Sequence, residues 1–264
     1  GEWTFPAGTV FVKHFEIPTD DRKEKTTKRL ETRLLVLDGT GAGYGVTYRW
    51  RADGREADLV GPAGASEEVR IVDDDGPRQQ SWTYPGREDC LKCHTAIAGF
   101  VLGPKTRQLN REVRYDSTGV VDNQIRAWNA LGLVAPAVRE GDIPGFDRLV
   151  AVDDESAPLE HRVRSYLDSN CMNCHRPGAN IPSAFDARFD TPLAQAKILD
   201  APTMSDSLGI PAPRVVAPGD PKRSLLLQRM LQAERFKMPP LARDRVDRAA
   251  VSAFERWIAT LPAR

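Results

Sequence analysis

The 264-residue sequence has no run of about 18 apolar residues, the length that a membrane-spanning helix needs. It also has no excess charge of either sign, because 37 basic residues balance 37 acidic ones. A nucleic-acid-binding domain is usually strongly basic. Cysteine is scarce, and none of the 4 cysteines lies outside two short motifs. These absences exclude a transmembrane helix from the chain and argue against nucleic acid as a partner.

The two cysteine motifs have the same form, C-x-x-C-H, and occupy residues 90–94 and 171–175. This string is the attachment signature of a c-type haem. Its two cysteines bond to the porphyrin, and the adjoining histidine is an axial ligand of the iron. We therefore expect two covalently attached haem c groups. The expected haem-binding residues are Cys90, Cys93 and His94 in the first motif, and Cys171, Cys174 and His175 in the second.

Other uses of paired cysteines fit the spacing less well. A zinc ribbon has its second cysteine pair about 15–20 residues after the first, whereas most of a domain separates Cys93 from Cys171. A thioredoxin-type redox pair needs a βαβ setting, and no buried apolar strand precedes either motif. Metal–thiolate binding, disulfides and free thiols remain as the alternatives.

The motifs also predict where the protein resides. Covalent haem attachment takes place outside the cytoplasm in bacteria, and the lack of spare cysteines suits an oxidising compartment. Residue 1 is Gly, and no charged segment followed by an apolar one comes after it. We expect a periplasmic or otherwise extracytoplasmic protein whose N-terminal signal or membrane anchor has been removed.

Residues 1–85 have the pattern of a small antiparallel β domain with five or six strands. Short runs of alternating or apolar residues predict these strands, and turn residues such as Asp38-Gly39 separate them. The charged stretch 20–29 is expected to be a solvated hairpin arm. The predicted strands lie at residues 9–17, 34–37, 44–50, 69–72 and 80–84.

The rest of the chain is expected to be mainly helical, which makes the fold class α+β. Residues 86–157 form the first haem-binding segment and a linker, with helices expected at 88–99 and 122–133. Residues 158–264 form the last domain. Its predicted helices span 158–170, 224–233 and 246–261, the last with an apolar stripe at spacings of three and four.

Residues 158–264 resemble a class I cytochrome c domain. The resemblance is carried by a helix that ends in the second motif, by R-P-G at 176–178, by P-G-D-P at 218–221, by M-P-P at 238–240 and by the Trp257 helix. Two prolines stiffen the chain after Met238, which favours this methionine as the sixth ligand of the second iron. The resemblance also implies that Pro177 orients His175.

The whole chain resembles bacterial di-haem modules that occur alone or joined to quinoprotein sugar-dehydrogenase-like propellers. The resemblance implies a quinoprotein dehydrogenase as a possible electron donor. The supporting segments are residues 8–10, 13–15, 29–33, 45–50, 102–103 and 108–111.

The sixth ligand of the first haem is left open by the sequence. No methionine lies between the two motifs. His14 on the first strand is one candidate, and its use would give the β domain the role of covering a haem face. His161 is a second candidate. The iron is otherwise five-coordinate or bound by an unusual ligand such as Lys or Tyr.

Charge is unevenly distributed along the chain. Residues 1–155 hold 21 basic and 26 acidic residues, and residues 156–264 hold 16 and 11. The basic excess lies around Met238, where it could steer an acidic partner. One or two of these arginines, with Arg223 as the candidate, are expected to pair with haem propionates. The basic residues are Arg214, Lys222, Arg223, Arg229, Arg235, Lys237, Arg243, Arg245 and Arg248.

Electron transfer is the function that these features favour, with no catalytic residue assigned. Electrons would pass from a periplasmic dehydrogenase across both haems to an acceptor cytochrome or oxidase. Methionine ligation raises a haem potential, so haems with different ligands form a directed path. The alternatives are a di-haem peroxidase or oxidase-like enzyme, with Glu112 or Gln108 as its distal group, and a haem-based sensor or structural subunit.

Overall fold

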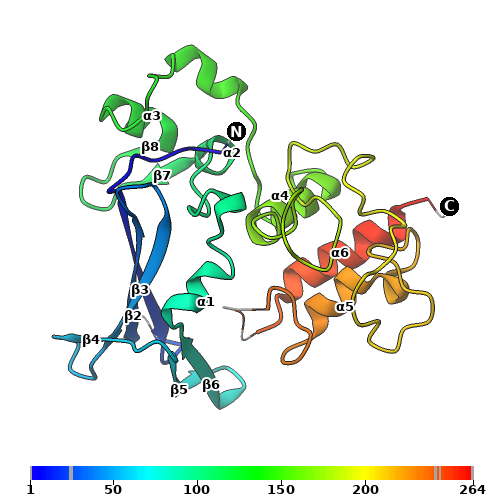
Figure 1. Cartoon of the computed structure of the whole chain (residues 1–264), viewed down its shortest axis with the longest axis horizontal. Helices are drawn as coiled ribbons and strands as arrows, with labels where there is room; N and C mark the ends of the chain where they lie inside the picture. The colour runs from blue at the N-terminus through cyan, green and yellow to red at the C-terminus, as the bar shows by residue number, and fades with distance from the viewer. Residues whose placement is uncertain (1, 24–25, 241–242, 244, 263–264) are drawn as a thin grey trace. The chain divides into compact units, whose positions relative to one another are not determined.

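The computed structural model describes residues 2–23, 26–240, 243 and 245–262. Antiparallel sheets precede a mainly helical region (Figure 1), which confirms the α+β class. The chain forms two compact units. We call Phe5–Leu102 with Gln232–Val246 the β unit, and Gly1–Thr4 with Gly103–Leu231 and Asp247–Arg264 the helical unit. The limits of these two units differ from the predicted domain boundaries after residues 85 and 157. Those domain boundaries stay a prediction.

The main sheet of the β unit is antiparallel and has the order β1-β2-β3-β4 among the described residues. A separate hairpin, β5–β6, follows it (Figure 1). The expected five or six strands are therefore present in the described part of the chain. They are β1 (Val10–Pro18), β2 (Thr27–Leu37), β3 (Gly43–Trp50), β4 (Ala57–Leu59), β5 (Ala65–Asp73) and β6 (Gly76–Tyr84).

The charged stretch 20–29 is less solvated than its composition predicts. Asp20 is buried, and the backbone N–H of Asp21 donates to the Val72 carbonyl at 2.8 Å. Strand β2 already begins at Thr27. Residues 24–25 of this expected arm lie outside the described residues. The hydrogen bond to β5 satisfies a backbone N–H group of this stretch, which in a free hairpin would bond to water.

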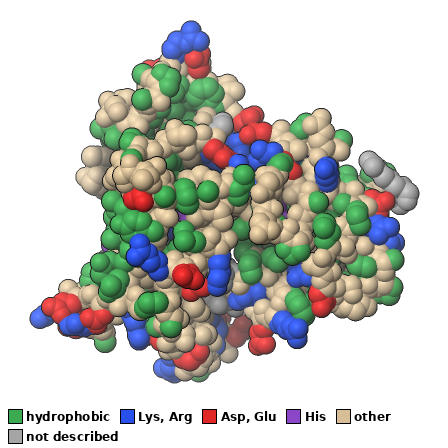
Figure 2. Space-filling model, viewed as in Figure 1, with side chains coloured by type: hydrophobic (Ala, Val, Ile, Leu, Met, Phe, Trp, Pro, Cys, Tyr) green, Lys and Arg blue, Asp and Glu red, His purple; other side chains and the backbone are tan. Residues whose placement is uncertain are grey.

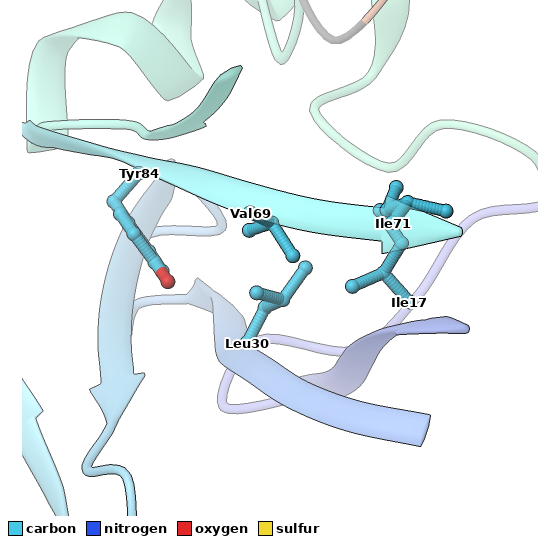
Figure 3. Close-up of a cluster of buried hydrophobic side chains, with 5 residues drawn as sticks. All are labelled: Ile17, Leu30, Val69, Ile71 and Tyr84. Atoms are coloured by element: carbon cyan, nitrogen blue, oxygen red, sulfur yellow. The ribbon is translucent and has the colours of Figure 1, made fainter. Parts of the chain in front are cut away.

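A hydrophobic cluster joins the main sheet to the β5–β6 hairpin (Figure 3). The pairing of β1 with β2 slips between Phe15 and Glu16, so Leu30 is the extra residue of a β-bulge. Its side chain is completely buried. Burial of an aliphatic side chain of this size contributes about 1.5–3 kcal/mol. The cluster consists of Ile17, Leu30, Val69, Ile71 and Tyr84.

The expected helix at 88–99 is wrong in its extent. Helix α1 covers only Arg87–Leu91, and a 3-10 turn follows at Ala96–Ala98. Gly99 and then Phe100 adopt positive φ angles of 69° and 59°. This left-handed pair turns the chain back, so that the carbonyl of Phe100 reaches the His94 ring.

The helical unit begins with short elements that the sequence signals less clearly. Strands β7 (Glu112–Arg114) and β8 (Val121–Asn123) were not expected, and they shorten the predicted helix 122–133 to α3 (Gln124–Ala130). The Asn123 side chain accepts a hydrogen bond from the N–H of Ile125 and so caps this helix. The other elements here are α2 (Thr106–Leu109) and the 3-10 turn η2 (Glu140–Gly145).

The three helices expected in residues 158–264 are confirmed as α4 (Leu159–Asn170), α5 (Leu225–Leu231) and α6 (Arg248–Thr260). Helix α4 packs on α6, where the rings of Tyr166 and Phe254 meet edge to face at 5.6 Å. The stripe of α6 is buried as its periodicity predicts. The 3-10 turn η3 (Pro221–Arg223) precedes α5.

Charged side chains of both signs are interspersed on the face of the molecule that Figure 2 shows. None of the helices in the described residues is both long enough and apolar enough to cross a bilayer.

Candidate functional site

The two C-x-x-C-H motifs fold into the same backbone turn. In the first, the N–H groups of Cys93 and His94 donate to the carbonyl of Cys90 at 3.3 and 2.9 Å. In the second, Cys174 and His175 donate to the carbonyl of Cys171 at 3.1 and 2.8 Å. The first turn begins in the last residues of α1 (Arg87–Leu91), and the second directly follows α4 (Leu159–Asn170). The structure thus brings the two cysteines and the histidine of each motif together within one turn.

In the first motif the backbone holds the imidazole of His94. Its Nδ1 lies 2.6 Å from the carbonyl oxygen of Phe100. Because a carbonyl only accepts, Nδ1 carries the proton and the lone pair of Nε2 is available to a metal. Burial is the main cause that lowers the pKa of His94, against the hydrogen bond to Phe100. The ring is therefore neutral at pH 7, the form in which histidine binds a metal.

In the second motif the imidazole of His175 stacks on the ring of Phe185, with centroids 4.1 Å apart. Burial lowers the pKa of His175 to about 4. Its Nδ1 is buried and has no hydrogen-bond partner among the described residues. Pro177, which was expected to orient this ring through its carbonyl, does not form that bond and is exposed. A buried polar atom of this kind is rare without a ligand or an ordered water.

The thiols of Cys90 and Cys171 do not have the character of redox-active cysteines. Burial raises the pKa of Cys90. Burial, with a further contribution from Cys174, raises the pKa of Cys171 to about 12. Reactive cysteines of oxidoreductases need a lowered pKa, so the thioredoxin-type alternative lacks its chemical basis. A zinc site would need several such ligands together, and the described residues contain no group of three or more His, Cys, Asp or Glu placed to hold a metal ion.

Two glycines of β3 let the main sheet approach the first motif closely. A Cβ atom at Gly45 would lie 2.4 Å from the Cys90 sulfur, and one at Gly43 would lie 2.6 Å from Cβ of Phe100. Both distances are too short for a real contact. These glycines have the same parity, so they lie on one face of the strand. We call this face of the main sheet, which carries Gly45, the motif face.

His14 lies on the opposite face of the same sheet. Gly45 pairs with Leu35, which pairs with Phe11, whereas His14 pairs with Thr32. Directly paired residues share a face and successive residues alternate. His14 Nδ1 bonds to the hydroxyl of Thr32 at 2.7 Å. The structure therefore does not bring His14 and His94 together, against the expectation of a bis-His haem.

The remaining predicted site residues lie as follows. His161 Nε2 is engaged with the Arg148 carbonyl at 2.8 Å. Met238 is half-buried in the segment 232–246, which belongs to the β unit, whereas His175 belongs to the helical unit. The role of Met238 at the second iron stays a prediction. Arg223 is exposed and donates to the Ala212 carbonyl at 3.0 Å, and its propionate contact also stays a prediction.

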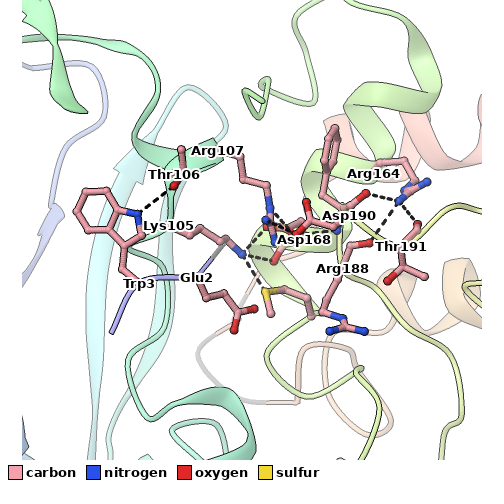
Figure 4. A network of polar contacts seen from close by, with 12 residues as sticks. Glu2, Trp3, Lys105, Thr106, Arg107, Arg164, Asp168, Arg188, Asp190 and Thr191 are labelled. Atoms are coloured by element: carbon pink, nitrogen blue, oxygen red, sulfur yellow. Dashed lines mark hydrogen bonds and ion pairs between the residues drawn. The ribbon is translucent and has the colours of Figure 1, made fainter. Parts of the chain in front are cut away.

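A buried ionic network lies beside the second motif (Figure 4). Asp168, on the last turn of α4, is completely buried and bonds to Arg107 at 2.8 Å and to Lys105. Lys105 Nζ also lies 2.8 Å from the sulfur of Met172, inside the motif. Burial alone would raise the pKa of Asp168, but hydrogen bonds from Arg107 and the charge of Lys105 outweigh it and lower the pKa.

Several of these residues were missed by sequence reasoning. A glycine pair spaced by two in a strand, as at 43 and 45, is a signal for close backbone approach. Asp168 directly follows Leu167 in the predicted helix, and both side chains are buried. An acidic residue next to an apolar core position could have indicated a buried ion pair. Nothing local pointed to Phe100 or Phe185, because their contacts depend on how the chain turns back after each motif.

The candidate distal groups of a peroxidase, Gln108 and Glu112, do not share with either motif the cavity that the described residues form around Glu112. Glu112 lines a cavity of ≈ 390 Å³ with Arg111 and Arg148, and no motif residue lines it. Gln108 and Glu112 both belong to the helical unit, whereas His94 belongs to the β unit.

Comparisons of the chain with protein-family models, with curated proteins and with solved structures found no match. The functional interpretation therefore depends on the geometry of the two motifs. That geometry fits a tethered haem at both places. In each motif one backbone turn carries two cysteines and a histidine whose pKa is lowered. His94 offers Nε2, and His175 has an orphaned ring nitrogen.

Proposed function

We propose that the chain is a di-haem c-type cytochrome that transfers electrons between redox proteins. The observation that carries the proposal is the repeated backbone turn, in which the N–H groups of the second cysteine and of the histidine both donate to the carbonyl of the first cysteine. Haem iron supplies one-electron redox chemistry when it is bound. The chain's own residues would tether it through Cys90 and Cys93 or Cys171 and Cys174, and would ligate it through the adjoining histidine.

Helices α4 and α6 support a class I cytochrome c arrangement for residues 158–264 as part of this proposal. Helix α4 leads directly into the second motif and packs on α6. Met238, before two prolines, is the residue that we propose would be the sixth ligand of the second iron. Phe185 stacks on the His175 ring and would fix its rotation, which an axial ligand needs.

The proposal is for an electron carrier, and a di-haem peroxidase or oxidase-like enzyme stays the alternative. The proposed location is periplasmic or otherwise extracytoplasmic. The proposed donor is a periplasmic dehydrogenase, including a quinoprotein, and the acceptor is another cytochrome or an oxidase.

The basic residues near Met238 contribute to partner binding only where they are exposed. Arg229 is buried and donates to the backbone carbonyl of Asp206 at 2.9 Å, and Arg214 forms an ion pair with Asp200 at 3.2 Å. These two are thus unsuited to steering an acidic partner. The exposed basic residues of the segment are Lys222, Arg223, Arg235, Arg245 and Arg248.

Haem attachment can be tested directly by intact mass. The protein, produced together with the covalent haem-attachment machinery and denatured, should exceed the polypeptide mass by two haems and contain two irons per chain. Removal of Cys90 and Cys93 together, or of Cys171 and Cys174 together, should each leave one haem. A holoprotein mass equal to that of the bare polypeptide, or zinc in place of iron, would falsify the proposal.

Electron transfer is tested by rapid mixing with a reduced donor protein and an oxidised acceptor cytochrome. Reduction and reoxidation of both haems should occur without a soluble substrate. Steady peroxide turnover with a cytochrome donor would instead support the enzyme alternative.

A further inference from the structure

A row of three polar residues crosses the motif face of the main sheet. Lys13 on β1 pairs with Arg33 on β2, and Arg33 pairs with Thr47 on β3. All three are hydrogen-bond donors, and two are cations. The next row towards the first motif is Phe11, Leu35 and Gly45, and Gly45 is the residue that touches Cys90. The donor row therefore lies one step along the strands from the first motif.

Arg33 is held in place by a buried carboxylate. Its Nε and one terminal nitrogen donate to Glu31 at 3.0 and 2.6 Å. Glu31 has no exposed surface and also accepts from Trp82 Nε1 at 3.0 Å. The guanidinium stacks on Phe15 at 4.3 Å. Two of its three nitrogens are thus used for positioning, and the third has no protein partner among the described residues.

The other two members of the row also have donor capacity left over. Lys13 has no carboxylate partner in the described part of the chain, and its Nζ lies 4.8 Å from the centre of the Phe15 ring. The hydroxyl of Thr47 is buried, with 3% of the residue exposed, and has no hydrogen-bond partner among the described residues. A buried hydroxyl of this kind costs free energy unless something bonds to it.

The electrostatics of the first motif show the same proximity. After burial, the charges of Arg33 and Lys13 are further causes of the lowered pKa of His94. Arg33 likewise opposes the effect of burial on the pKa of Cys90. Arg33 is therefore close enough to act on both the thiol of Cys90 and the imidazole of His94, and Lys13 acts on the imidazole.

We propose that the row Lys13–Arg33–Thr47 binds a propionate carboxylate of the first haem. This inference rests on the proposed function. A carboxylate is acceptor-only and takes several donors, including an arginine and a lysine, in charge-assisted bonds. The row offers such a set, with one cation fixed by Glu31 and one neutral buried donor. The β domain would then hold the edge of the first haem, in place of the axial contact by His14 that the sequence suggested.

The proposal has a consequence with a definite sign. Positive charge beside a haem disfavours the oxidised form, which carries one positive charge more than the reduced form. Removal of a cation from the row should therefore lower the potential of the first haem, and removal of the Glu31 charge should raise it. Both changes remove one partner of the Arg33–Glu31 ion pair, but they should shift the potential in opposite directions. A general loss of folding would not produce opposite shifts.

The experiment uses the holoprotein with both haems attached and compares Arg33→Gln, Lys13→Met and Thr47→Val. The two charge variants should shift the one-electron equilibrium of the first haem about threefold to tenfold towards the oxidised form. Tenfold corresponds to a potential lower by about 59 mV. Thr47→Val should change the propionate vibrations in the resonance Raman spectrum with little change in potential. Glu31→Gln should shift the potential upwards.

Matched controls separate binding from general charge effects. Arg29→Gln removes a cation from the same strand β2, but Arg29 stacks on Trp50 of the opposite face at 4.7 Å, so its effect should be much smaller. Lys13→Arg keeps the charge and the donors and should keep the potential and the Raman bands.

Three results would overturn the inference. The first is an unchanged potential and unchanged propionate bands in Arg33→Gln and Lys13→Met. The second is equal shifts in Arg29→Gln and Arg33→Gln. The third is a change to a high-spin first haem in both Lys13→Met and Lys13→Arg, which would make Lys13 an iron ligand instead. A chain without attached haem would be detected first by mass, and that result refutes the proposed function.

Discussion

A histidine's role in this protein is set by the partner of its Nδ1 atom. In His94 that partner is the backbone carbonyl of Phe100, which leaves Nε2 for the proposed haem iron. In His14 it is the hydroxyl of Thr32, whose oxygen also accepts from Trp50. The motif singles out His94 in the sequence, and the hydrogen bond to Phe100 shows which of its two ring nitrogens is available.

Replacement of His14 by Ala should leave the first haem unchanged. The side chain lies on the face of the sheet opposite to Cys90, so its removal costs only the bond to Thr32, about 1 kcal/mol of stability. Optical and electron paramagnetic resonance spectra of the oxidised holoprotein check the spin state. A change of the first haem from low to high spin in His14→Ala would restore this histidine as the sixth ligand.

Replacement of Met238 by Ala should remove the methionine-to-iron absorption band of the second haem and lower its potential, because methionine ligation raises the potential. Met204, whose exposure is 66%, provides the matched control, and Met204→Ala should retain both properties. Persistence of the band in Met238→Ala would exclude this residue as the ligand.

At the scale of elements, the contact between β3 and the first motif is the most sensitive to small changes. Gly45→Ala would place a methyl group 2.4 Å from the Cys90 sulfur. The strand or the motif must move, at a cost of about 1–3 kcal/mol. We expect a lower unfolding temperature and a larger fraction of chains with a single haem by mass.

Gly39→Ala serves as the comparison for this substitution, since a Cβ there meets nothing within 4 Å. It should leave haem content and stability unchanged. Full haem content and wild-type stability in Gly45→Ala would mean that the close approach of β3 is not needed.

The ion pairs of α4 predict a strong effect of Asp168→Asn. The substitution leaves the buried cations Lys105 and Arg107 without their carboxylate, and breaking such a pair costs about 3–5 kcal/mol. Chemical denaturation at pH 7 measures the loss. Asp190, which bonds to the same Arg107 but has 56% of its side chain exposed, is the control, and Asp190→Asn should cost under about 1 kcal/mol.

The contribution of Asp168 should also depend on pH. Its pKa is lowered in the folded state, so its contribution is complete above the unfolded-state pKa of about 3.9 and is lost as the pH falls through the lower folded-state value. The difference in unfolding free energy between wild type and Asp168→Asn should be constant above about pH 5 and shrink below about pH 4. A difference that grows in acid would contradict this assignment.

Elements with a strong local pattern were predictable from the sequence. The period of α6, the alternation in β3 and the turn residues after β2 are each encoded within about ten residues. The interruption of the helix after Leu91 was not, because it depends on Phe100 returning to His94. The face on which His14 lies also could not be read locally, since register and coverage depend on strands far apart in sequence.

At the scale of the whole molecule, the two haems are expected to have different potentials. The proposed second haem has a methionine ligand, and the first has none that the sequence can supply between the motifs. Methionine raises the potential, so a redox titration of the holoprotein should show two one-electron steps, the higher assigned to the second haem. The Met238→Ala variant should move the higher step alone. A single step in wild type, unchanged by Met238→Ala, would contradict a directed path.

The ionic network around Asp168 has a consequence for transferring the C-terminal part of the chain, residues 158–264, to another protein. Residues 158–264 are proposed to form a cytochrome c domain, yet Asp168, in the last turn of their first helix, pairs with two cations from outside that stretch, Lys105 and Arg107. A fragment cut at residue 158 would therefore inherit a stranded negative charge inside its core. Shuffling of this module between proteins, in evolution or in the laboratory, would have to carry residues 105–107 along or neutralise position 168.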